Sequence, residues 1–225
     1  MSSGYMLNYL QMKFSPKAQQ IYDSINKDGI KLGDLRNIAK EIKKDHELAI
    51  ELWNTHNFMA RQLAILIMDP KLLNQQAIDQ LDQDIQQHPE EERLQLIDWL
   101  LANQFSKDKK TIALMLSWRN SPSVLQRRTF WYYQGRLRWV GQPSPTNTEE
   151  ILSIIENEIE KEQPEVQWAM NFTAAQIGIF QESLRNRCIS LGERTALYKH
   201  DIVAKGCTPG YLPELISIQV AKLKK

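Results

Sequence analysis

The chain has 225 residues, a formal net charge of +1 and 42% hydrophobic residues, values typical of a globular protein with a substantial core. This near-neutral charge excludes a protein that binds a polyanion through overall positive charge. Any nucleic-acid binding must come from a local concentration of positive charge. The two cysteines, Cys188 and Cys207, lack ligand-like spacing to the histidines. This argues against a disulfide scaffold or a structural zinc site and favours a reducing compartment.

Membrane and export signals are not evident in the sequence. No apolar run approaches the roughly 20 residues that a membrane span needs. The N-terminal sequence MSSGYMLNYLQMKF lacks the basic region and continuous apolar stretch of a secretory signal. We therefore expect a cytoplasmic, monomeric protein without membrane contact.

Helical periodicity dominates the first half of the chain. Ser15 and Pro16 form a cap followed by a proline at the first helical position, which predicts a helix through Ile25. Similar signals predict four more helices: one begun by Gly33-Asp34 that runs to residue 44, one capped by Asp45 over 46–55, one capped by Asn57 over 58–68, and one over 71–87.

The second half continues in the same way. The predicted helices are one opened by Glu90, Glu91 and Glu92 that runs to residue 105, one over 107–118 capped by Ser106, one opened by Ser121-Pro122, three around 151–159, 168–179 and 184–195, and one from Pro213 to Lys222. Gly141–Thr148 and His200–Tyr211 have loop composition. No strand is predicted, because period-two alternation is absent wherever the apolar pattern is strong.

These elements predict an all-α protein that forms a single domain over residues 1–225. Paired helices that recur every roughly 30–40 residues are typical of HEAT-like repeats. We therefore expect a curved right-handed solenoid, an alpha-alpha superhelix, with a C-terminal loop and helix at about 200–225. A helical bundle is the alternative, but many short helices favour a stack.

Positive charge is gathered in one segment, Lys107–Trp139, where the basic residues outnumber the single acid, Asp108, and are interleaved with aromatic residues. Such a segment suits a nucleic-acid backbone and its bases. The alternative is a solvated helix face with core tryptophans. Because Arg127 shares a helical face with Trp131 and Arg128 does not, the whole segment cannot meet one DNA strand, and some of its aromatic residues must belong to the core.

Asp98 is the most unusual acid, because it stands mid-helix within LQLIDWLL. A buried unpaired charge is costly, so this carboxylate is expected to be half-exposed, paired or functional. It can equally lie on the polar edge of its helix or bond a neighbouring helix end. The four histidines stand singly and no glycine-rich phosphate loop occurs, so neither a metal nor a cofactor is expected.

Three stretches resemble the DNA alkylation repair family, the AlkD-like glycosylases with HEAT-like repeats. The first is GIKLGDLRNIAKEI followed by ELWNTHNFMARQLAILIM, the second is WAMNFTAAQIG, and the third is the tail GERTALYKHDIVAKGCTPGYLPELI. The resemblance implies a stack of helical pairs that grips duplex DNA on a basic face. In such enzymes a carboxylate stabilises the positive charge that develops as an N3- or N7-alkylated purine leaves.

The resemblance also implies roles for particular residues. The family's Trp-x-x-x-Asp pattern falls on Leu94 to Asp98, which keeps the catalytic acid and replaces the aromatic residue; a shifted alignment puts Glu91 or Glu92 in its place. The family's phosphate-binding arginine falls on Arg127, and its second tryptophan on Phe172. The wider DNA-binding set is then Arg127, Arg128, Trp131, Arg136, Arg138 and Phe172.

Three functions follow from this comparison. The first is an alkylpurine (3-methyladenine or 7-methylguanine) DNA glycosylase without a cofactor, in which Asp98 is the electrostatic stabiliser. The second is a relative that binds DNA without excision, because the loss of the aromatic residue at Leu94 removes stacking worth about 1–3 kcal/mol. The third is a solenoid that binds a partner protein, for which the acidic residues 41–99 are the best support.

Overall fold

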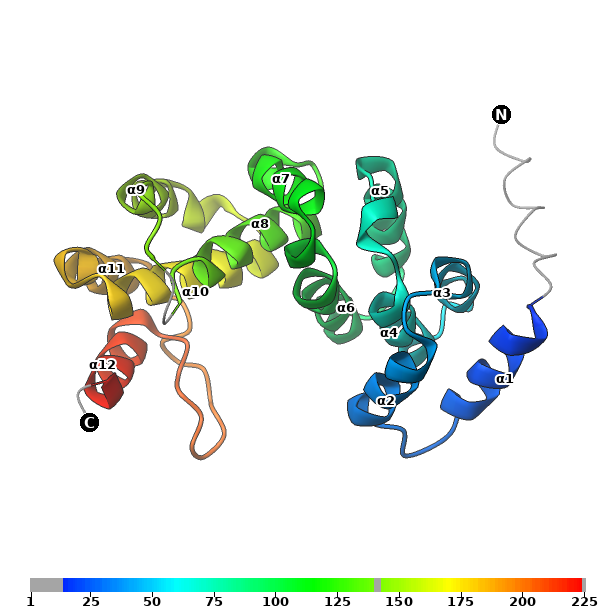
Figure 1. The fold of residues 1–225 in the computed structure, drawn as a ribbon. Helices are drawn as coiled ribbons and strands as arrows, with labels where there is room; N and C mark the ends of the chain where they lie inside the picture. The colour runs from blue at the N-terminus through cyan, green and yellow to red at the C-terminus, as the bar shows by residue number, and fades with distance from the viewer. Residues whose placement is uncertain (1–13, 140–142, 224–225) are drawn as a thin grey trace. The chain divides into compact units, whose positions relative to one another are not determined.

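The structure, a computed structural model, describes residues 14–139 and 143–223. Within these residues it is all-α and contains no strand, as predicted (Figure 1). The chain divides into two compact units, Met1–Leu114 and Met115–Lys225, with the boundary inside α7 (Lys109–Ser117). The N-terminal segment considered above as an export signal lies outside the described residues up to residue 13.

The first unit follows the predicted order of helices. It holds α1 (Pro16–Ile25), α2 (Leu32–Ile42), α3 (His46–Trp53), α4 (Phe58–Ile67), α5 (Gln75–Ile85) and α6 (Glu90–Asn103). Three of the predicted caps are confirmed: the side-chain oxygens of Ser15, Asp45 and Asn57 accept hydrogen bonds from the backbone N–H groups three residues later, at 3.1, 3.2 and 3.0 Å.

Two helix starts in this unit differ from the prediction. The helix predicted over 71–87 is divided into a 3₁₀ turn, Pro70–Leu72, and α5, which begins later because the Asn74 side chain caps the N–H of Ala77 at 2.8 Å. Helix α2 begins at Leu32 instead of after Asp34. The Asp34 carboxylate accepts a bond from the backbone N–H of Lys31 at 2.9 Å, so it lies inside the first turn.

The core of the first unit is built on α3 and α4. Trp53, Leu52 and Leu63 are fully buried there, together with the charged Arg61. The Arg61 guanidinium lies 4.8 Å over the Trp53 ring and donates to the carbonyl of Asp84 at 2.8 Å, while the Trp53 indole donates to the Asp84 carboxylate at 2.7 Å. This network satisfies the buried charge and ties α5 to α3 and α4.

The second unit contains the remaining helices. They are α8 (Val124–Arg136), α9 (Thr148–Glu158), α10 (Pro164–Phe180), α11 (Glu182–Thr195) and α12 (Leu212–Leu223). The last helix is close to the predicted Pro213–Lys222. Of the predicted loop Gly141–Thr148, residues 141 and 142 lie outside the described residues, and Thr148 already belongs to α9.

Two predicted caps near α7 and α8 are wrong. Ser106 donates to the carbonyl of Ala102 at 3.4 Å, and it is Asp108 that accepts from an N–H of the first turn of α7. Helix α8 is capped by Ser123, which accepts from the N–H of Gln126 at 3.2 Å. Ser121, the predicted cap, donates instead to the side chain of Gln126.

Helices α8 and α10 pack against each other along the centre of the second unit. A glycine, Gly135, allows the close approach, because a Cβ atom there would lie 2.5 Å from the ring of Phe172. The hydroxyl of Thr173 on α10 donates to the carbonyl of Trp131 on α8. Met170 and Ile177 on α10 are fully buried as well. The two helices are therefore closely packed, and other side chains are placed on this pair.

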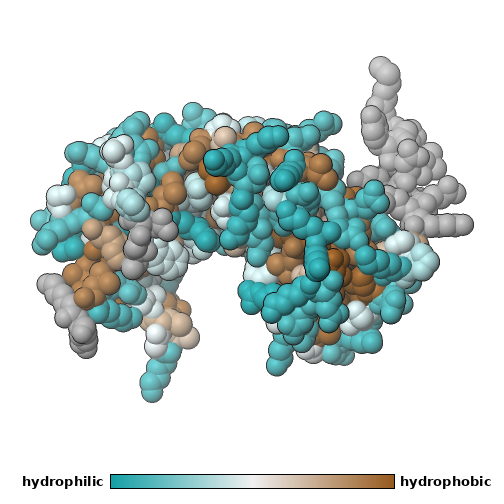
Figure 2. All heavy atoms as spheres, in the orientation of Figure 1, coloured by the Kyte–Doolittle hydropathy of each residue, from teal (hydrophilic) through white to brown (hydrophobic). Residues whose placement is uncertain are grey.

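The loop between α11 and α12, residues 196–211, is called the tail loop below. It projects from the second unit as the orange segment of Figure 1, and its Ile202 is fully exposed. Figure 2 shows an apolar area over α12, where Ile218 and Leu223 are exposed. No helix within the described ranges is long and apolar enough to cross a membrane.

Candidate nucleic-acid interface

In the first unit, Asp98 lies on α6 at the edge of a small pocket of about 290 Å³. Its side chain is half-buried, which is one of the states expected from the sequence for an acid among apolar neighbours. The lining residues come from α2, α4 and α6 and are Leu32, Gln62, Leu94, Gln95, Asp98 and Trp99. Leu94, which stands at the family's aromatic position, therefore lines the same pocket as the carboxylate.

An aromatic ring borders this pocket although Leu94 does not supply one. The indole of Trp99 donates to the carbonyl of Gln62 at 3.2 Å, which fixes the ring. The guanidinium of the exposed Arg36 lies over that ring, 4.9 Å from its centroid. Neither residue was singled out from the sequence. Their signals were the tryptophan directly after Asp98 and an arginine four positions after Leu32.

In the second unit, Arg127 is bound within the protein. Its Nη2 lies 3.1 Å from Oε2 of Glu162, and its Nη1 donates to the carbonyl of Ser121 at 2.8 Å. The two charged side chains are 17% and 19% exposed. The predicted phosphate ligand therefore already has an anionic partner.

Arg138 and Trp131 lie in the interior, with 2% and 1% exposure. Arg138 donates to the carbonyl of Gln134 and to the side chains of Asn147 and Thr148, and burial lowers its pKa to about 10. Trp131 packs edge-on against Phe130. We therefore assign both residues to the core and not to a DNA-binding surface, since buried side chains with internal contacts cannot reach a ligand.

Arg128 is also buried, but it supports an exposed aromatic ring. Its guanidinium lies 4.4 Å from the centroid of Trp168, and its Nη1 donates to the carbonyl of Glu165 at 3.1 Å. Arg136, in the last turn of α8, is half-buried. The basic segment thus holds two kinds of arginine. Arg127, Arg128 and Arg138 make contacts within the unit, whereas Arg136 is partly accessible to solvent.

Phe172 is the centre of an aromatic cluster formed by α8, α10 and Trp139, which follows α8 in the chain. The cluster consists of Tyr132, Trp139, Trp168 and Phe172. Phe172 stacks parallel to Trp168 at 5.8 Å and meets Tyr132 edge-on at 4.9 Å. Trp139 and Trp168 are 49% and 39% exposed, unusually high fractions for tryptophan.

Two pockets flank Phe172. One, of about 310 Å³, extends along α10 and α12 and includes Trp139, Gln176 and Gln219. The other, of about 340 Å³, lies between α10 and the tail loop and includes Trp168, Tyr198 and Asp201. The sequence indicated Phe172 through the family resemblance, but it gave no indication that the tail loop would complete a pocket around it.

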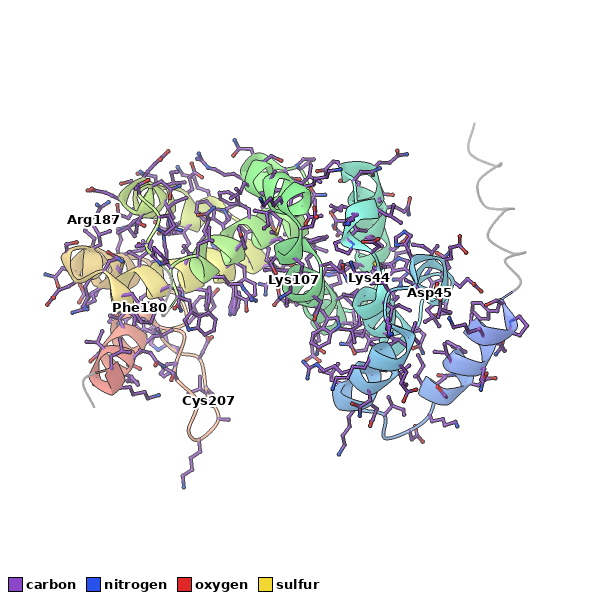
Figure 3. All side chains as sticks on the ribbon, in the orientation of Figure 1. Lys44, Asp45, Lys107, Phe180, Arg187 and Cys207 are labelled. Atoms are coloured by element: carbon purple, nitrogen blue, oxygen red, sulfur yellow. The ribbon has the colours of Figure 1, made fainter. Side chains whose placement is uncertain are left out.

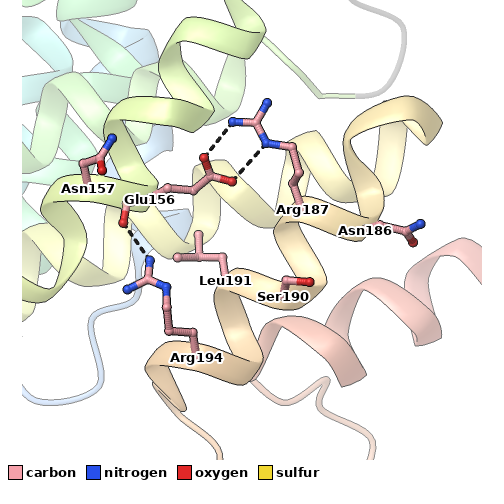
Figure 4. Close-up of a pocket in the computed structure, with 7 residues that line it drawn as sticks. All are labelled: Glu156, Asn157, Asn186, Arg187, Ser190, Leu191 and Arg194. Atoms are coloured by element: carbon pink, nitrogen blue, oxygen red, sulfur yellow. Dashed lines mark hydrogen bonds and ion pairs between the residues drawn. The ribbon is translucent and has the colours of Figure 1, made fainter.

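A further pocket, of about 580 Å³, lies between α9 and α11 (Figure 4). Its charges are already paired: Arg187 binds Glu156 at 2.6 Å, and Arg194 binds Glu160 and the carbonyl of Glu156. Figure 3 shows Arg187 on the same helix pair. These contacts join α9 to α11, so we interpret this pocket as a structural feature.

The described ranges contain no group of three or more His, Cys, Asp or Glu side chains that could hold a metal ion. Asp98 belongs to the first unit, while Arg127, Phe172 and the aromatic cluster belong to the second. The candidate residues therefore form two groups, a carboxylate pocket in the first unit and an aromatic cluster in the second.

The chain is similar to known proteins over most of its length. No curated protein matches the chain. A solved structure described as "a new family of proteins related to the HEAT-like repeat DNA glycosylases with affinity for branched DNA structures" matches with a TM-score of 0.66 and 19% identity, over 99% of this chain and 95% of that one. This match confirms the HEAT-like repeat fold. The model of the DNA alkylation repair enzymes matches residues 9–194, so the chain belongs to the DNA alkylation repair enzyme family.

Proposed function

We propose that the protein binds DNA and that the aromatic cluster around Phe172 forms part of the binding surface. The observation that carries this proposal is the exposure of Trp139 and Trp168 beside Phe172 on a rigid helix pair. Exposed aromatic rings provide stacking platforms for bases, each worth about 1–3 kcal/mol. Burying these rings against DNA would also explain why large apolar surfaces are left open to solvent.

Several features support DNA as the ligand. The chain is a member of a DNA repair family, and its structural neighbour belongs to proteins with affinity for branched DNA. Arg136 adds positive charge on α8, the helix that carries Tyr132. Because Arg127 is paired with Glu162, the phosphate contacts must come mainly from other basic residues. We therefore expect both duplex and branched DNA to bind, with unpaired bases as an additional determinant.

A binding assay tests this proposal directly. Fluorescence anisotropy is measured with labelled duplex and three-way-junction DNA over a series of salt concentrations. The logarithm of the binding constant should fall linearly with the logarithm of the salt concentration. Trp168→Ala should weaken binding about tenfold. Leu116→Ala, which removes a comparably exposed apolar side chain from the same unit, is the control and should change little. Failure of both DNAs to bind at low salt would overturn the proposal.

A second candidate function, excision of alkylated purines, rests on Asp98. A half-buried carboxylate at the edge of a pocket beside Trp99 can stabilise positive charge that develops on a deoxyribose. Incubation with methylated duplex DNA should then release 7-methylguanine or 3-methyladenine. Asp98→Asn should abolish the release while binding persists. Binding without release would leave a non-catalytic DNA-binding protein, and a stoichiometric protein partner without DNA binding would favour the protein-interaction alternative.

A further inference from the structure

The pocket between α10 and the tail loop has walls of two different chemical kinds. One wall is aromatic, because the Trp168 and Phe172 rings lie nearly parallel, with an interplanar angle of 7°. The other wall comes mainly from the tail loop and includes two side chains that can hydrogen-bond, Tyr198 and Asp201, beside Thr208 and Pro209. Its volume of about 340 Å³ lies at the small end of the range for ligand sites, roughly 300–1,000 Å³.

The tail loop is held in place at its base by specific contacts. The Asn171 side chain on α10 donates to the carbonyl of Gly210 at 2.9 Å. A Cβ atom on Gly210 would lie 3.1 Å from Cβ of Tyr198, so glycine allows the tyrosine to pack directly on the loop backbone. Tyr198 has a φ of 62° and Ala196 a φ of 51°, values that are unfavourable for these residues. Backbone strain of this kind is often found where a functional side chain is held in a fixed position.

The tail-loop wall has a defined hydrogen-bonding character. Burial, and then the charge of Asp201, raises the pKa of Tyr198 to about 12, so its phenol remains a proton donor at neutral pH. The exposed Asp201 carboxylate is an acceptor. The pocket thus has an aromatic face on one side and, on the other, Asp201 as an acceptor and Tyr198 as a donor. These groups suit a planar heterocycle that stacks on the aromatic face and hydrogen-bonds along its edge.

We propose that this pocket binds one unpaired nucleobase that carries an amino group, stacked on Trp168 and hydrogen-bonded to Asp201. The inference rests on the proposed DNA binding and adds the part of the DNA that this site recognises. Guanine fits best, because its ring N–H and its amino group can both donate to one carboxylate. Cytosine can donate to the carboxylate only through its amino group. Thymine fits worst, since its single ring N–H donor is flanked by two carbonyl oxygens that would face the carboxylate.

The position of the pocket in the sequence gives this site a further property. The family match ends at residue 194, whereas the second wall comes mainly from the tail loop. The aromatic wall lies within the residues that the family model matches, and the tail-loop wall lies after them. Base selection would therefore depend on the tail loop, and a relative without an acid at the position of Asp201 would bind DNA without it.

The test uses the full-length protein and three labelled duplexes that differ at one position. One is fully paired, one carries a single extrahelical guanine, and one a single extrahelical thymine. We expect the guanine duplex to bind about tenfold more tightly than the paired duplex, the magnitude of one stacked base. We expect the thymine duplex to bind several-fold more weakly than the guanine duplex, since thymine offers Asp201 one ring N–H where guanine offers a ring N–H and an amino group.

Asp201→Asn should reduce the preference for guanine over thymine to about onefold. The amide has both an acceptor and a donor, so it can bond the donors of guanine or the carbonyl oxygens of thymine. Removing a negative charge also strengthens binding to any DNA, so the guanine-to-thymine ratio is the readout and not the affinity alone. Glu214→Gln on α12 is the matched control: this exposed acid lies outside the pocket lining, and its loss should leave the ratio unchanged.

The outcomes separate this inference from the proposed function. Tight, salt-dependent binding of all three duplexes with equal affinity would overturn the base pocket and leave DNA binding intact. A guanine preference that survives Asp201→Asn would also overturn it, because recognition would then lie elsewhere. Failure of every duplex to bind would overturn both proposals together.

Discussion

The guanidinium of Arg127 is held by the carboxylate of Glu162, which lies 35 residues later in the chain. Nε lies 3.2 and 3.3 Å from the two carboxylate oxygens, and Nη2 lies 3.1 Å from one of them. Nη1 is bound to the carbonyl of Ser121. Because all three nitrogens are engaged, a DNA phosphate could reach this arginine only by breaking bonds that hold the start of α8 to the segment before α10.

Arg127→Ala is therefore expected to affect stability more than DNA binding. It removes several hydrogen bonds to charged groups and should lower the free energy of unfolding by about 1.5–3 kcal/mol. Arg136→Ala on the same helix is the comparison and should weaken DNA binding with little loss of stability. Urea unfolding and anisotropy measure the two quantities. A stable Arg127→Ala variant with strongly reduced DNA affinity would restore the phosphate-binding role.

Glu162→Gln should have the opposite effect on binding. The amide keeps the shape of the side chain but leaves the Arg127 charge uncompensated and available to phosphate. DNA affinity should rise, and the slope of log K against log salt should steepen by about 0.9, the value for one additional phosphate contact. Glu193→Gln, which removes an exposed acid from α11, is the control. An unchanged slope relative to that control would show that Arg127 does not face the DNA.

Gly135→Ala tests the packing that positions Phe172. The added methyl group would lie 2.5 and 2.6 Å from two ring atoms of Phe172, so α8 and α10 must separate or the ring must move. We expect a loss of about 1–3 kcal/mol in stability and weaker DNA binding. Gly33→Ala on α2 meets no atom within 4 Å and should instead gain about 0.5–1 kcal/mol. Equal effects at the two positions would contradict the close packing of α8 on α10.

The fold was predictable from the sequence because its signals are local. Caps such as Ser15 and Asn57 and the helical spacing of apolar residues depend on neighbours within one or two turns. The errors arose where several capping residues compete. Around α8, Ser121 and Ser123 are equally good caps by composition, and the choice depends on the Gln126 side chain, which bonds Ser121 and leaves Ser123 to cap.

The candidate site was predictable only in part, because its decisive contacts join distant residues. Asp98 was recognisable as an acid among apolar neighbours, and it is half-buried at a pocket. The role of Arg127 could not be read locally, since Glu162 lies beyond the next helix, α9, and 35 residues along the chain. The same holds for the pocket around Phe172, whose tail-loop wall depends on how the tail loop packs on Asn171. A composition count of basic residues does not distinguish buried arginines from exposed ones.

The buried Cys188 predicts a specific dependence of stability on pH. Burial raises the pKa of its thiol from 9.0 to about 12. Above pH 9 the unfolded chain loses a proton that the folded chain retains, so this contribution to stability is complete below pH 9 and is lost as the pH rises towards 12. The free energy of unfolding should then fall by about 1.4 kcal/mol per pH unit for this group.

Urea unfolding of the native sequence and of Cys188→Ala between pH 8 and 10.5 measures this contribution as a difference in slope. Tyr198, whose pKa burial also raises to about 12, adds to the decline above pH 10 in both proteins. Cys207→Ala is the control, since that thiol is exposed on the tail loop (Figure 3). Parallel slopes for the native sequence and Cys188→Ala would contradict the effect of burial.

Arg36 is the residue that we expect to bring DNA phosphate to the Asp98 pocket. It is exposed, it lies over the Trp99 ring, and it stands one helical turn after Leu32, which lines that pocket. Arg36→Gln should weaken binding of duplex DNA at every sequence and reduce the salt slope by about one, as expected for the loss of one phosphate contact. The stability should change little, because stacking of an exposed arginine contributes only about 0.5–1 kcal/mol. Lys27→Gln, an exposed charge in the turn before α2, is the matched control. If the two variants lose affinity equally, general charge and not the position of Arg36 over Trp99 determines binding at this end of the protein.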